Sequence, residues 1–182
     1  QTTVASPNES DWVNSTVSNR VGSSATVTGL TNGTDYYFRV LATNGAALSS
    51  PYSDVSAVTK PFTMPSAPTI AVTGVTGAMN ITITAGSDNG RPITGYQWTL
   101  DGGLTWTAFS NTSLTQQLAG LVNGTTYNLK VRALNLAGIG AESNLGTVTP
   151  LGLVSAPNIT GITGSDASLT VSFSSPTDDG GS

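Results

Sequence analysis

The chain of 182 residues contains no cysteine and no histidine. Their absence removes disulfide bonds, thiol nucleophiles, imidazole general bases and the usual zinc ligands. Charge is also scarce, because only 9% of the residues are charged and the net charge is −4. There is no basic stripe to bind a nucleic acid backbone, and no apolar run approaches the roughly 18 residues of a membrane-spanning helix. We therefore expect neither a nucleic acid partner nor a membrane span.

Signatures of catalysis are missing as well. The sequence has no G-x-S-x-G elbow, no P-loop and no dinucleotide-binding fingerprint. Its paired acidic residues are neighbours within turns, whereas general acid and base catalysis needs two groups that face one cleft. These absences predict a protein that is not an enzyme, with no catalytic residues and no cofactor.

What the chain does contain is typical of strands and turns. Threonine and serine make up more than a quarter of the residues, and there are 21 glycines and 9 prolines. Threonine, valine and isoleucine favour pleated surfaces, and frequent glycine, asparagine and proline divide such surfaces into short strands. No window has the 3.6-residue apolar period of an amphipathic helix. The composition predicts an all-β fold.

The sequence also repeats itself with a period of about 90 residues. The segment GLTNGTDYYFRVLATN at 29–44 matches GLVNGTTYNLKVRALN at 120–135, and SAP at 66–68 returns at 155–157. These matches define one complete copy and two partial ones. The predicted domains are the C-terminal part of a module at 1–60, a complete module at 66–150 and the first two strands of another at 155–182.

Apolar residues alternate with polar ones inside each copy. In AMNITITA, residues 78–85, Met79, Ile81 and Ile83 share one face. Period-two alternation predicts antiparallel strands with one buried face, and turn signals every 8 to 12 residues or so are typical of a β-sandwich. The other predicted inward rows are Leu169, Val171 and Phe173; Tyr127, Leu129, Val131 and Ala133; and Tyr36, Phe38, Val40 and Ala42.

These motifs resemble those of the fibronectin type III domain in all three segments. The resemblance rests on SAP before the first strand, ITGYQW for the third strand and GLxNGTxYxxxVxAxN across the sixth. It implies antiparallel β-sandwiches in tandem, and it implies that Tyr36 and Tyr127 form the tyrosine corner of the fold. The family usually has a tryptophan in the second strand, where this chain has Ile83 and Phe173. We expect Trp98 in the third strand to compensate.

The two partial copies raise the question of what completes them. The ending TDDGGS aligns with residues 87–92 of the complete copy, and the beginning QTTVASPNESDW aligns with 95–106. One interpretation is that the sequence is an excerpt from a longer array. The other is that neighbouring copies of the chain complete one another, because an unpaired strand edge is a template for another chain. Proline in the linkers at 60–68 and 150–157 favours a semi-rigid rod.

The segment TLDGGLTW, residues 99–106, matches the Asp-box pattern known from sialidases and other β-propellers. In this pattern Asp101 accepts N–H groups of the turn, Gly103 adopts a positive φ and Trp106 packs beneath. Sugar recognition is the functional interpretation, and a well-formed turn is the structural one. We favour the turn, because the first copy retains only Trp12 of the pattern.

Two further sets of residues are candidate binding positions. Acidic and amide side chains recur in one loop and could hold Ca²⁺, although each loop offers at most two, and capping of the turn explains them more simply. Tyr37 lies opposite an inward row and is the candidate contact for a surface or glycan. The calcium candidates are Asp88, Asn89, Asp178 and Asp179.

The sequence thus predicts structural spacer modules of a long extracellular repeat protein. Such a protein would be a surface fibre, sheath or adhesin, or a phage tail fibre, and its partners would be copies of itself or neighbouring repeat domains. A helical filament subunit is a variant of this prediction. The alternative is an accessory module of a secreted enzyme or adhesin that binds carbohydrate or another surface, with extracellular glycans as partners. Both predictions place the chain outside the cell or on a virion.

Overall fold

The computed structural model describes residues 17–21, 23–177 and 179–181. Its regular structure in these ranges consists of β-strands, all of them paired antiparallel. The fold class predicted from the sequence is thereby confirmed. No helix that could cross a membrane occurs in the described ranges. The chain divides into unit 1, residues 1–63 with 89–91, and unit 2, residues 64–88 with 92–182.

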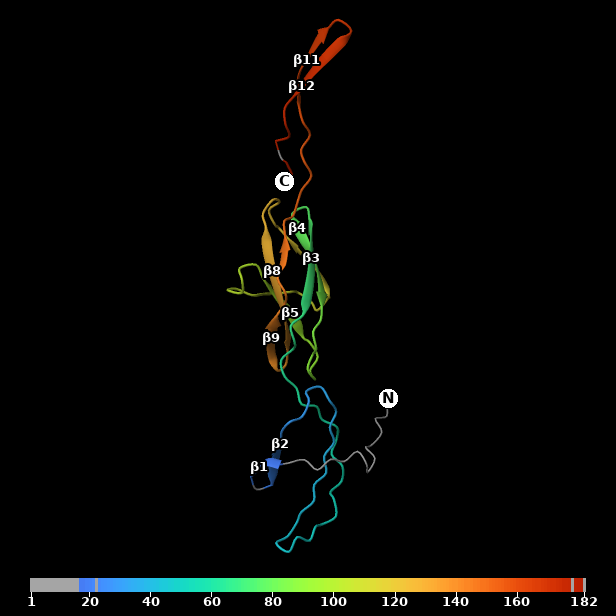
Figure 1. The fold of residues 1–182 in the computed structure, drawn as a ribbon, viewed down its shortest axis with the longest axis vertical. Coiled ribbons are helices and arrows are strands. Elements are labelled where there is room, and N and C mark those ends of the chain that lie inside the picture. The colour runs from blue at the N-terminus through green and yellow to red at the C-terminus, as the bar shows by residue number, and fades with distance from the viewer. Residues whose placement is uncertain (1–16, 22, 178, 182) are drawn as a thin grey trace. The chain divides into compact units, whose positions relative to one another are not determined.

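Unit 2 contains a two-sheet sandwich that spans the complete sequence repeat (Figure 1). One sheet has the order β3, β4, β7, and the other has the order β10, β8, β5, β6, with β9 also paired to β8. This arrangement is a fibronectin type III-like sandwich. The strands are β3 (Thr69–Val75), β4 (Ala78–Thr84), β5 (Gly95–Thr99), β6 (Thr107–Ala108), β7 (Thr115–Ala119), β8 (Tyr127–Asn135), β9 (Gly138–Glu142) and β10 (Gly146–Val148).

The core of the sandwich lies between β4 of one sheet and β8 of the other. Buried and exposed residues alternate along both strands, as period two requires. Each fully buried isoleucine or leucine contributes about 1.5–3 kcal/mol by leaving water. The buried side chains from these strands are Ala78, Met79, Ile81, Ile83, Leu129, Val131 and Ala133.

An aromatic pair on β5 helps to fill the core where the family would have a tryptophan on the second strand. Tyr96 is 3% exposed and belongs to the buried cluster, and Trp98 is partly buried and packs against it. Burial raises the pKa of the Tyr96 phenol because the ionised form would lose its hydration. Trp98 also contacts Phe109, with ring centroids 6.4 Å apart. The core is therefore completed from the third strand.

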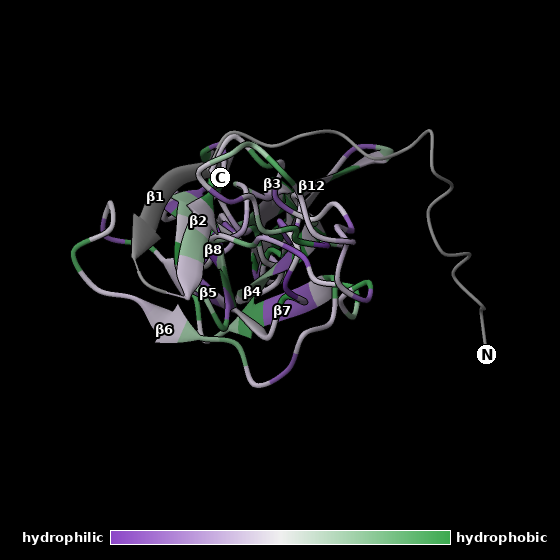
Figure 2. Cartoon of the chain, turned by 90° about the horizontal axis from the view of Figure 1, so that it is seen from below, coloured by the Kyte–Doolittle hydropathy of each residue, from purple (hydrophilic) through white to green (hydrophobic). Residues whose placement is uncertain are grey.

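The outward faces of the sheets are polar. Figure 2 shows a hydrophilic stretch and a hydrophobic end on β7, which match its sequence TQQLA. On the neighbouring strand, Asn80 accepts a hydrogen bond from the Gln117 amide at 2.8 Å. Uncharged amides and hydroxyls thus cover this face, in keeping with the low content of charged residues.

The third repeat contributes two strands to unit 2, β11 (Ile159–Ser165) and β12 (Ser168–Phe173). They form a hairpin in which Ile162 pairs with Val171, as Val72 pairs with Ile81 in the complete sandwich. All residues of both strands are exposed, apolar ones included. The hairpin therefore has the predicted apolar row, and no described residue covers it.

Unit 1 has one pair of strands, β1 (Val17–Val21) and β2 (Ser24–Val27), followed by an extended segment. Two isolated bridges, Tyr36 with Thr59 and Thr43 with Ser49, join the two arms of this segment. The predicted inward row at Tyr36, Phe38, Val40 and Ala42 is only half-buried at its first two members and exposed at the last two. No opposing sheet packs on this row within the described residues.

Serine hydroxyls take part in the pairing of the two arms. Each of three serines donates its backbone N–H to the carbonyl opposite and accepts the N–H of that same residue on its hydroxyl oxygen. Each hydroxyl then donates to the carbonyl of the next residue. The serines are spaced by three and their partners by two, so the ladder is irregular. The pairs are Ser50 with Ala42, Ser53 with Val40 and Ser56 with Phe38.

The complete sandwich uses the same device once, in its interior. Ser143 donates its N–H to the Val131 carbonyl at 2.8 Å and accepts the Val131 N–H on its hydroxyl at 3.0 Å. Both residues are buried. The next residue, Asn144, accepts the Ile70 N–H at 2.8 Å and donates to the Ile70 carbonyl at 3.0 Å, so its amide joins β3 to the chain entering β10.

We expect Ser143→Ala to destabilise the protein by about 1–3 kcal/mol, because the buried Val131 N–H would lose its acceptor. Denaturant unfolding followed by tryptophan fluorescence measures the change. Ser110→Ala, in an exposed loop of the same sandwich, is the matched control and should have a much smaller effect. Equal effects of the two substitutions would contradict the assigned role of the Ser143 hydroxyl.

Candidate functional site

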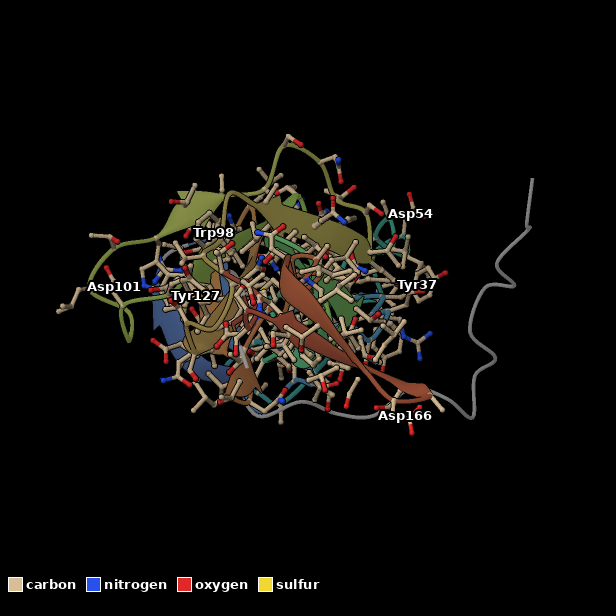
Figure 3. All side chains as sticks on the ribbon, turned by 90° about the horizontal axis from the view of Figure 1, so that it is seen from above. Tyr37, Asp54, Trp98, Asp101, Tyr127 and Asp166 are labelled. Carbon is tan, nitrogen blue, oxygen red and sulfur yellow. The ribbon has the colours of Figure 1, made fainter. Side chains whose placement is uncertain are left out.

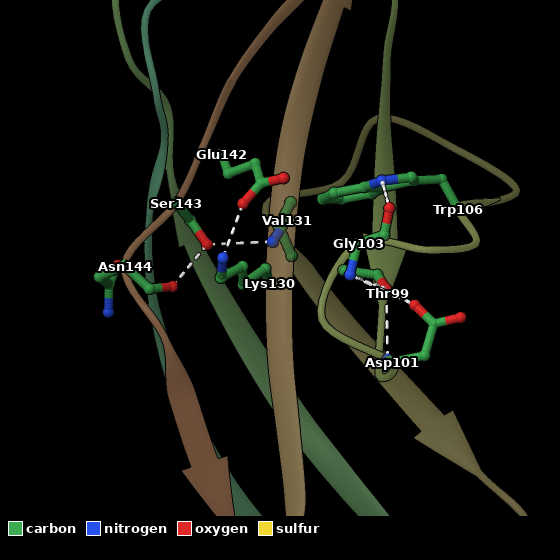
Figure 4. Close-up of polar contacts among 9 residues, drawn as sticks. All are labelled: Thr99, Asp101, Gly103, Trp106, Lys130, Val131, Glu142, Ser143 and Asn144. Atoms are coloured by element: carbon green, nitrogen blue, oxygen red, sulfur yellow. Dashed lines mark hydrogen bonds and ion pairs between the residues drawn. The ribbon is translucent and has the colours of Figure 1, made fainter.

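The loop between β5 and β6 carries the Asp-box sequence and is organised by Asp101 (Figure 4). The Asp101 carboxylate accepts the Thr105 N–H at 2.9 and 3.0 Å, the Thr105 hydroxyl at 2.5 Å and the Gly103 N–H at 3.3 Å. The Thr99 hydroxyl donates to it as well, at 2.5 Å. Gly103 has a φ of 100°, a conformation that favours glycine.

These donors stabilise the ionised carboxylate. The hydroxyl of Thr105, the hydroxyl of Thr99 and the backbone N–H of Thr105 hold the pKa of Asp101 well below its usual range. The carboxylate is consequently ionised at neutral pH, and its lone pairs are directed at donors of its own loop. Asp101 serves the turn, although it lies in a loop that projects from the sandwich (Figure 3).

Trp106 is anchored at the end of the same loop. Its indole N–H donates to the Gly103 carbonyl at 3.1 Å, and the guanidinium carbon of Arg132 lies 4.0 Å from its ring centroid. Arg132, on β8, also donates to the Gln97 side chain on β5 at 2.9 Å. The half-buried ring thus has one face covered by a cation, an arrangement that is stabilising in itself.

An ion pair lies on the same side of the sheet. Lys130 on β8 and Glu142 on β9 are 2.7 Å apart. A side-chain carbon added at Gly103 would lie 3.2 Å from the Glu142 carboxylate, so the Asp-box loop approaches this pair. We define the outer polar face of unit 2 as the residues Gln97, Trp106, Lys130, Arg132 and Glu142.

Among the described calcium candidates, the side chain of Asp179 bonds to the backbone of its own loop. The Asp179 carboxylate accepts the Gly181 N–H at 2.8 Å, as in an Asx turn. Asn89 has a φ of 51°, and the carbonyl of Asp88 accepts the Asn135 amide at 3.1 Å. No group of three acidic, histidine or cysteine residues gathers in the described ranges. Asp178 lies outside them.

The two tyrosines of the predicted corner make equivalent bonds. The phenolic oxygen of Tyr127 accepts the Val122 N–H at 3.0 Å, and that of Tyr36 accepts the Thr31 N–H at 3.0 Å. Both bonds reach five residues back along the chain. The role is structural in both copies, since each bond closes the loop that precedes the tyrosine.

The aromatic residues of unit 1 differ from the prediction in their exposure. Tyr37 is half-buried, whereas Tyr52 is 50% exposed and has the Arg39 guanidinium carbon 3.9 Å from its ring centroid. Figure 3 labels Tyr37. The alternation along 36–42 could not predict which of the two tyrosines is more exposed, because Tyr52 lies in the other arm of the segment.

Two open, shallow depressions are present on unit 2. Polar side chains of β4 and β7 line the first, and the loops around Tyr96 line the second. The first contains no titratable side chain, and the second includes the side chains of Asp88 and Tyr96. Their lining residues are Asn80, Ile81, Thr82, Thr115, Gln116 and Gln117 for the first, and Ala85, Gly86, Asp88, Pro92, Ile93, Tyr96, Thr112 and Leu114 for the second.

Sequence comparison finds similarity to part of a larger protein. The chain is 36% identical over 146 residues to Endoglucanase B of Cellulomonas fimi, and the match covers 74% of this chain and 14% of that protein. The chain thus spans about one seventh of this relative. No protein-family model matches the chain.

Solved structures with similar folds include titin kinase with its flanking domains, at 22% identity and a TM-score of 0.42 over 48% of this chain and 17% of that one. Another is the structure described as FN3tt mut, at 18% identity and a TM-score of 0.40 over 48% of this chain and 97% of that one. The sheets themselves carry the assignment of the fibronectin type III-like fold.

Several structural residues escaped the sequence reasoning. Asn144 and Ser143 stand in an unremarkable SNL stretch, and the contact of Arg132 with Trp106 joins residues far apart in the chain. The recurrence of serine every three residues at 50, 53 and 56 was a visible signal of the ladder in unit 1. The contact of Arg132 with Trp106 had no comparable signal, because it depends on the register of β5 against β8.

The lowered pKa of Asp101 predicts a pH-dependent contribution to stability. The contribution is present above the pKa of an unfolded aspartate, about 3.9, and is lost as the pH falls through the lower folded-state pKa. Melting temperatures of the parent and Asp101→Asn should therefore differ at neutral pH, and the difference should shrink progressively as the pH falls below about 4. Asp166→Asn, in the exposed turn between β11 and β12, controls for net charge. A difference that persists undiminished to the lowest pH would contradict the assignment.

Proposed function

We propose that the chain consists of structural spacer modules of a long extracellular repeat protein. The supporting observation is the contrast between equivalent apolar residues in two copies of the repeat. Leu169 and Phe173 on β12 are 72% and 68% exposed, whereas Met79 and Ile83 at the same positions of β4 are 0% and 2% exposed. Equivalent positions of two copies thus carry apolar residues in the same strand register, which supports repeated copies of one sandwich in series.

Three other properties support the spacer role. The complete sandwich carries an uncharged polar surface on β4 and β7, and its Asp-box loop is closed on itself by Asp101. The residues that the structure describes contain no cluster of acidic, histidine or cysteine residues that could hold a metal ion. A module of this kind contributes length and a folded core, and the ends or neighbours of the array would carry recognition. Surface fibre, sheath, adhesin and virion fibre all place the same mechanical demand on such a module.

The proposal predicts that the native polypeptide is much larger than 18.4 kDa. Intact-mass measurement on material from the natural source tests this, with the recombinant 182-residue chain as the reference. A native mass near 18.4 kDa would overturn the long-array form of the proposal. The exposed row of β12 would then have to be covered by a second copy, and the chain would be a filament subunit.

A second candidate function is that of an accessory module of a secreted enzyme or adhesin. The similarity to a segment of Endoglucanase B favours it. Exposed aromatic rings that could stack on sugars are the chemistry it needs. Tyr37 and Tyr52 are the aromatic candidates in unit 1, and the outer polar face with Trp106 is the candidate in unit 2. Both candidate functions imply an extracellular location.

Binding to insoluble polysaccharide separates the two functions. Under the spacer proposal the 182-residue chain should remain in the supernatant with microcrystalline cellulose, chitin or xylan. Retention that is lost in Tyr37→Ala or Tyr52→Ala would instead support the accessory module. Tyr36→Phe, which removes a hydroxyl of the tyrosine corner without removing a ring, is the matched control for unit 1 and should leave any retention intact.

A further inference from the structure

Glycine residues of consecutive repeats meet within unit 2. The Gly124 N–H, in the turn before β8, donates to the carbonyl of Pro150 in the linker at 2.8 Å. Two residues further along the linker, the Gly152 N–H donates to the Gly180 carbonyl at 2.7 Å. Gly180 belongs to the loop after β12 in the next repeat. The linker thus runs between a turn of one repeat and a loop of the following one, with a backbone hydrogen bond to each.

The close approach of backbone at this contact favours glycine at positions 124, 180 and 181. A side-chain carbon on Gly124 would lie 2.9 Å from the Gly181 Cα, and one on Gly181 would collide with the Gly124 nitrogen. A side-chain carbon on Gly152 would lie 2.5 Å from the Asn123 amide nitrogen. Gly124, Gly180 and Gly181 also have positive φ values of 77°, 73° and 86°. The close approach of the two backbone segments and their positive φ values therefore both favour glycine at these three positions.

Unit 1 contains a corresponding set of contacts in the preceding repeat, with the loop residues shifted by one position. The Gly33 N–H donates to the Pro61 carbonyl at 2.9 Å, and the Thr63 N–H donates to the Asn89 carbonyl at 3.2 Å. A side-chain carbon on Gly90 would lie 2.7 Å from the Pro61 oxygen and 2.9 Å from the Gly33 nitrogen. By its contact with the Asn-Gly turn Gly90 corresponds to Gly181, although the sequence alignment pairs it with Gly180, so the loop meets the turn one residue earlier in this repeat. The occurrence of the contact in two repeats of one chain supports a contact that recurs with the repeat.

The side chains around the two contacts differ. In unit 1 the Arg91 guanidinium carbon lies 4.1 Å from the ring centroid of Phe62, while Leu151 stands at the position of Phe62 in the second linker. Thr63 is likewise replaced by Gly152. What the two contacts share is the backbone hydrogen bonds and the glycines. Backbone groups therefore carry the recognition, and the linker side chains are free to vary.

We propose that the Asn-Gly turn before the sixth strand of each module is the docking surface for the glycine loop after the second strand of the next module. The partner is the following module of the same chain, and the three linker residues at 61–63 or 150–152 lie between them. This inference goes beyond the proposed function, because it holds equally for a spacer and for an accessory module. The docking surface is an uncharged backbone surface that any module with Asn-Gly and Gly at these places can use.

Amide hydrogen exchange of the ¹⁵N-labelled 182-residue chain tests this directly. The reporters are the N–H groups of Thr63 and Gly152, because each lies in a linker and donates to the next module. We expect both to exchange about fivefold or more slowly than in an unstructured chain, the ratio that one net backbone hydrogen bond supplies. Amides of β8 that pair with β5 report whether the sandwich is folded.

Three glycine substitutions make the test reciprocal. Gly181→Ala should release the Gly152 N–H and leave Thr63 protected, and Gly90→Ala should do the opposite. Gly120→Ala is the matched control, because Gly120 has a similar positive φ of 79° but nothing within 4 Å of an added side-chain carbon. It should leave both reporters protected. If the β8 amides of a variant lose protection, its sandwich is unfolded and that variant is not interpreted. The exchange rates of Thr63 and Gly152 in the parent chain then test the proposal.

Three results would overturn the proposal. One is exchange of Thr63 and Gly152 at the unstructured rate in the parent chain while β8 remains protected. Another is loss of protection in Gly120→Ala equal to that in Gly181→Ala, since the clash would then have no role. Protection that disappears on dilution would also overturn it, because the contact would then form between copies.

Discussion

The packing of β4 against β8 is the constraint on which the rest of the structure depends. Met79, Ile81 and Ile83 on one strand reach Leu129 and Val131 on the other, and these side chains are almost fully buried. A slip of one residue in either strand would turn the whole row to solvent. This packing fixes the two sheets, and the sheets fix the loops that form the Asp-box turn, the tyrosine corner and the linker contacts.

Neutral amides and hydroxyls supply the connections that charged residues supply in many proteins. Asn144 joins β3 to the chain before β10, Asn123 accepts the Gly77 N–H at 2.9 Å, and Asn135 donates to the Asp88 carbonyl. Each is a short side chain bonded to backbone, so little side-chain entropy is lost and no charge is desolvated. This explains how a chain with 9% charged residues satisfies its buried polar groups.

The alternation of apolar residues made the strands at 78–84 and 127–135 predictable, because period two follows directly from the pleat. The Asp-box turn was predictable for a similar reason, since its spacing encodes local bonds from Asp101 to Thr105 and Gly103. Contacts between distant segments were not predictable. The same alternation that is buried in β8 is exposed at Val40, because a pattern specifies which face is apolar and says nothing of what covers it. Likewise, Arg132 meets Trp106 only through the pairing of β8 with β5.

The glycines show how function and fold are connected in such a chain. Gly120 and Gly124 lie four residues apart in the same turn region, and both have positive φ, yet only Gly124 has another backbone against it. The first glycine serves the conformation of its own loop, and the second serves a contact with the following repeat. A repeat protein whose side chains vary can preserve the way its modules follow one another if that contact consists of backbone groups. Selection for the contact would then act on a few glycines and would leave the exposed surface of each module free to change.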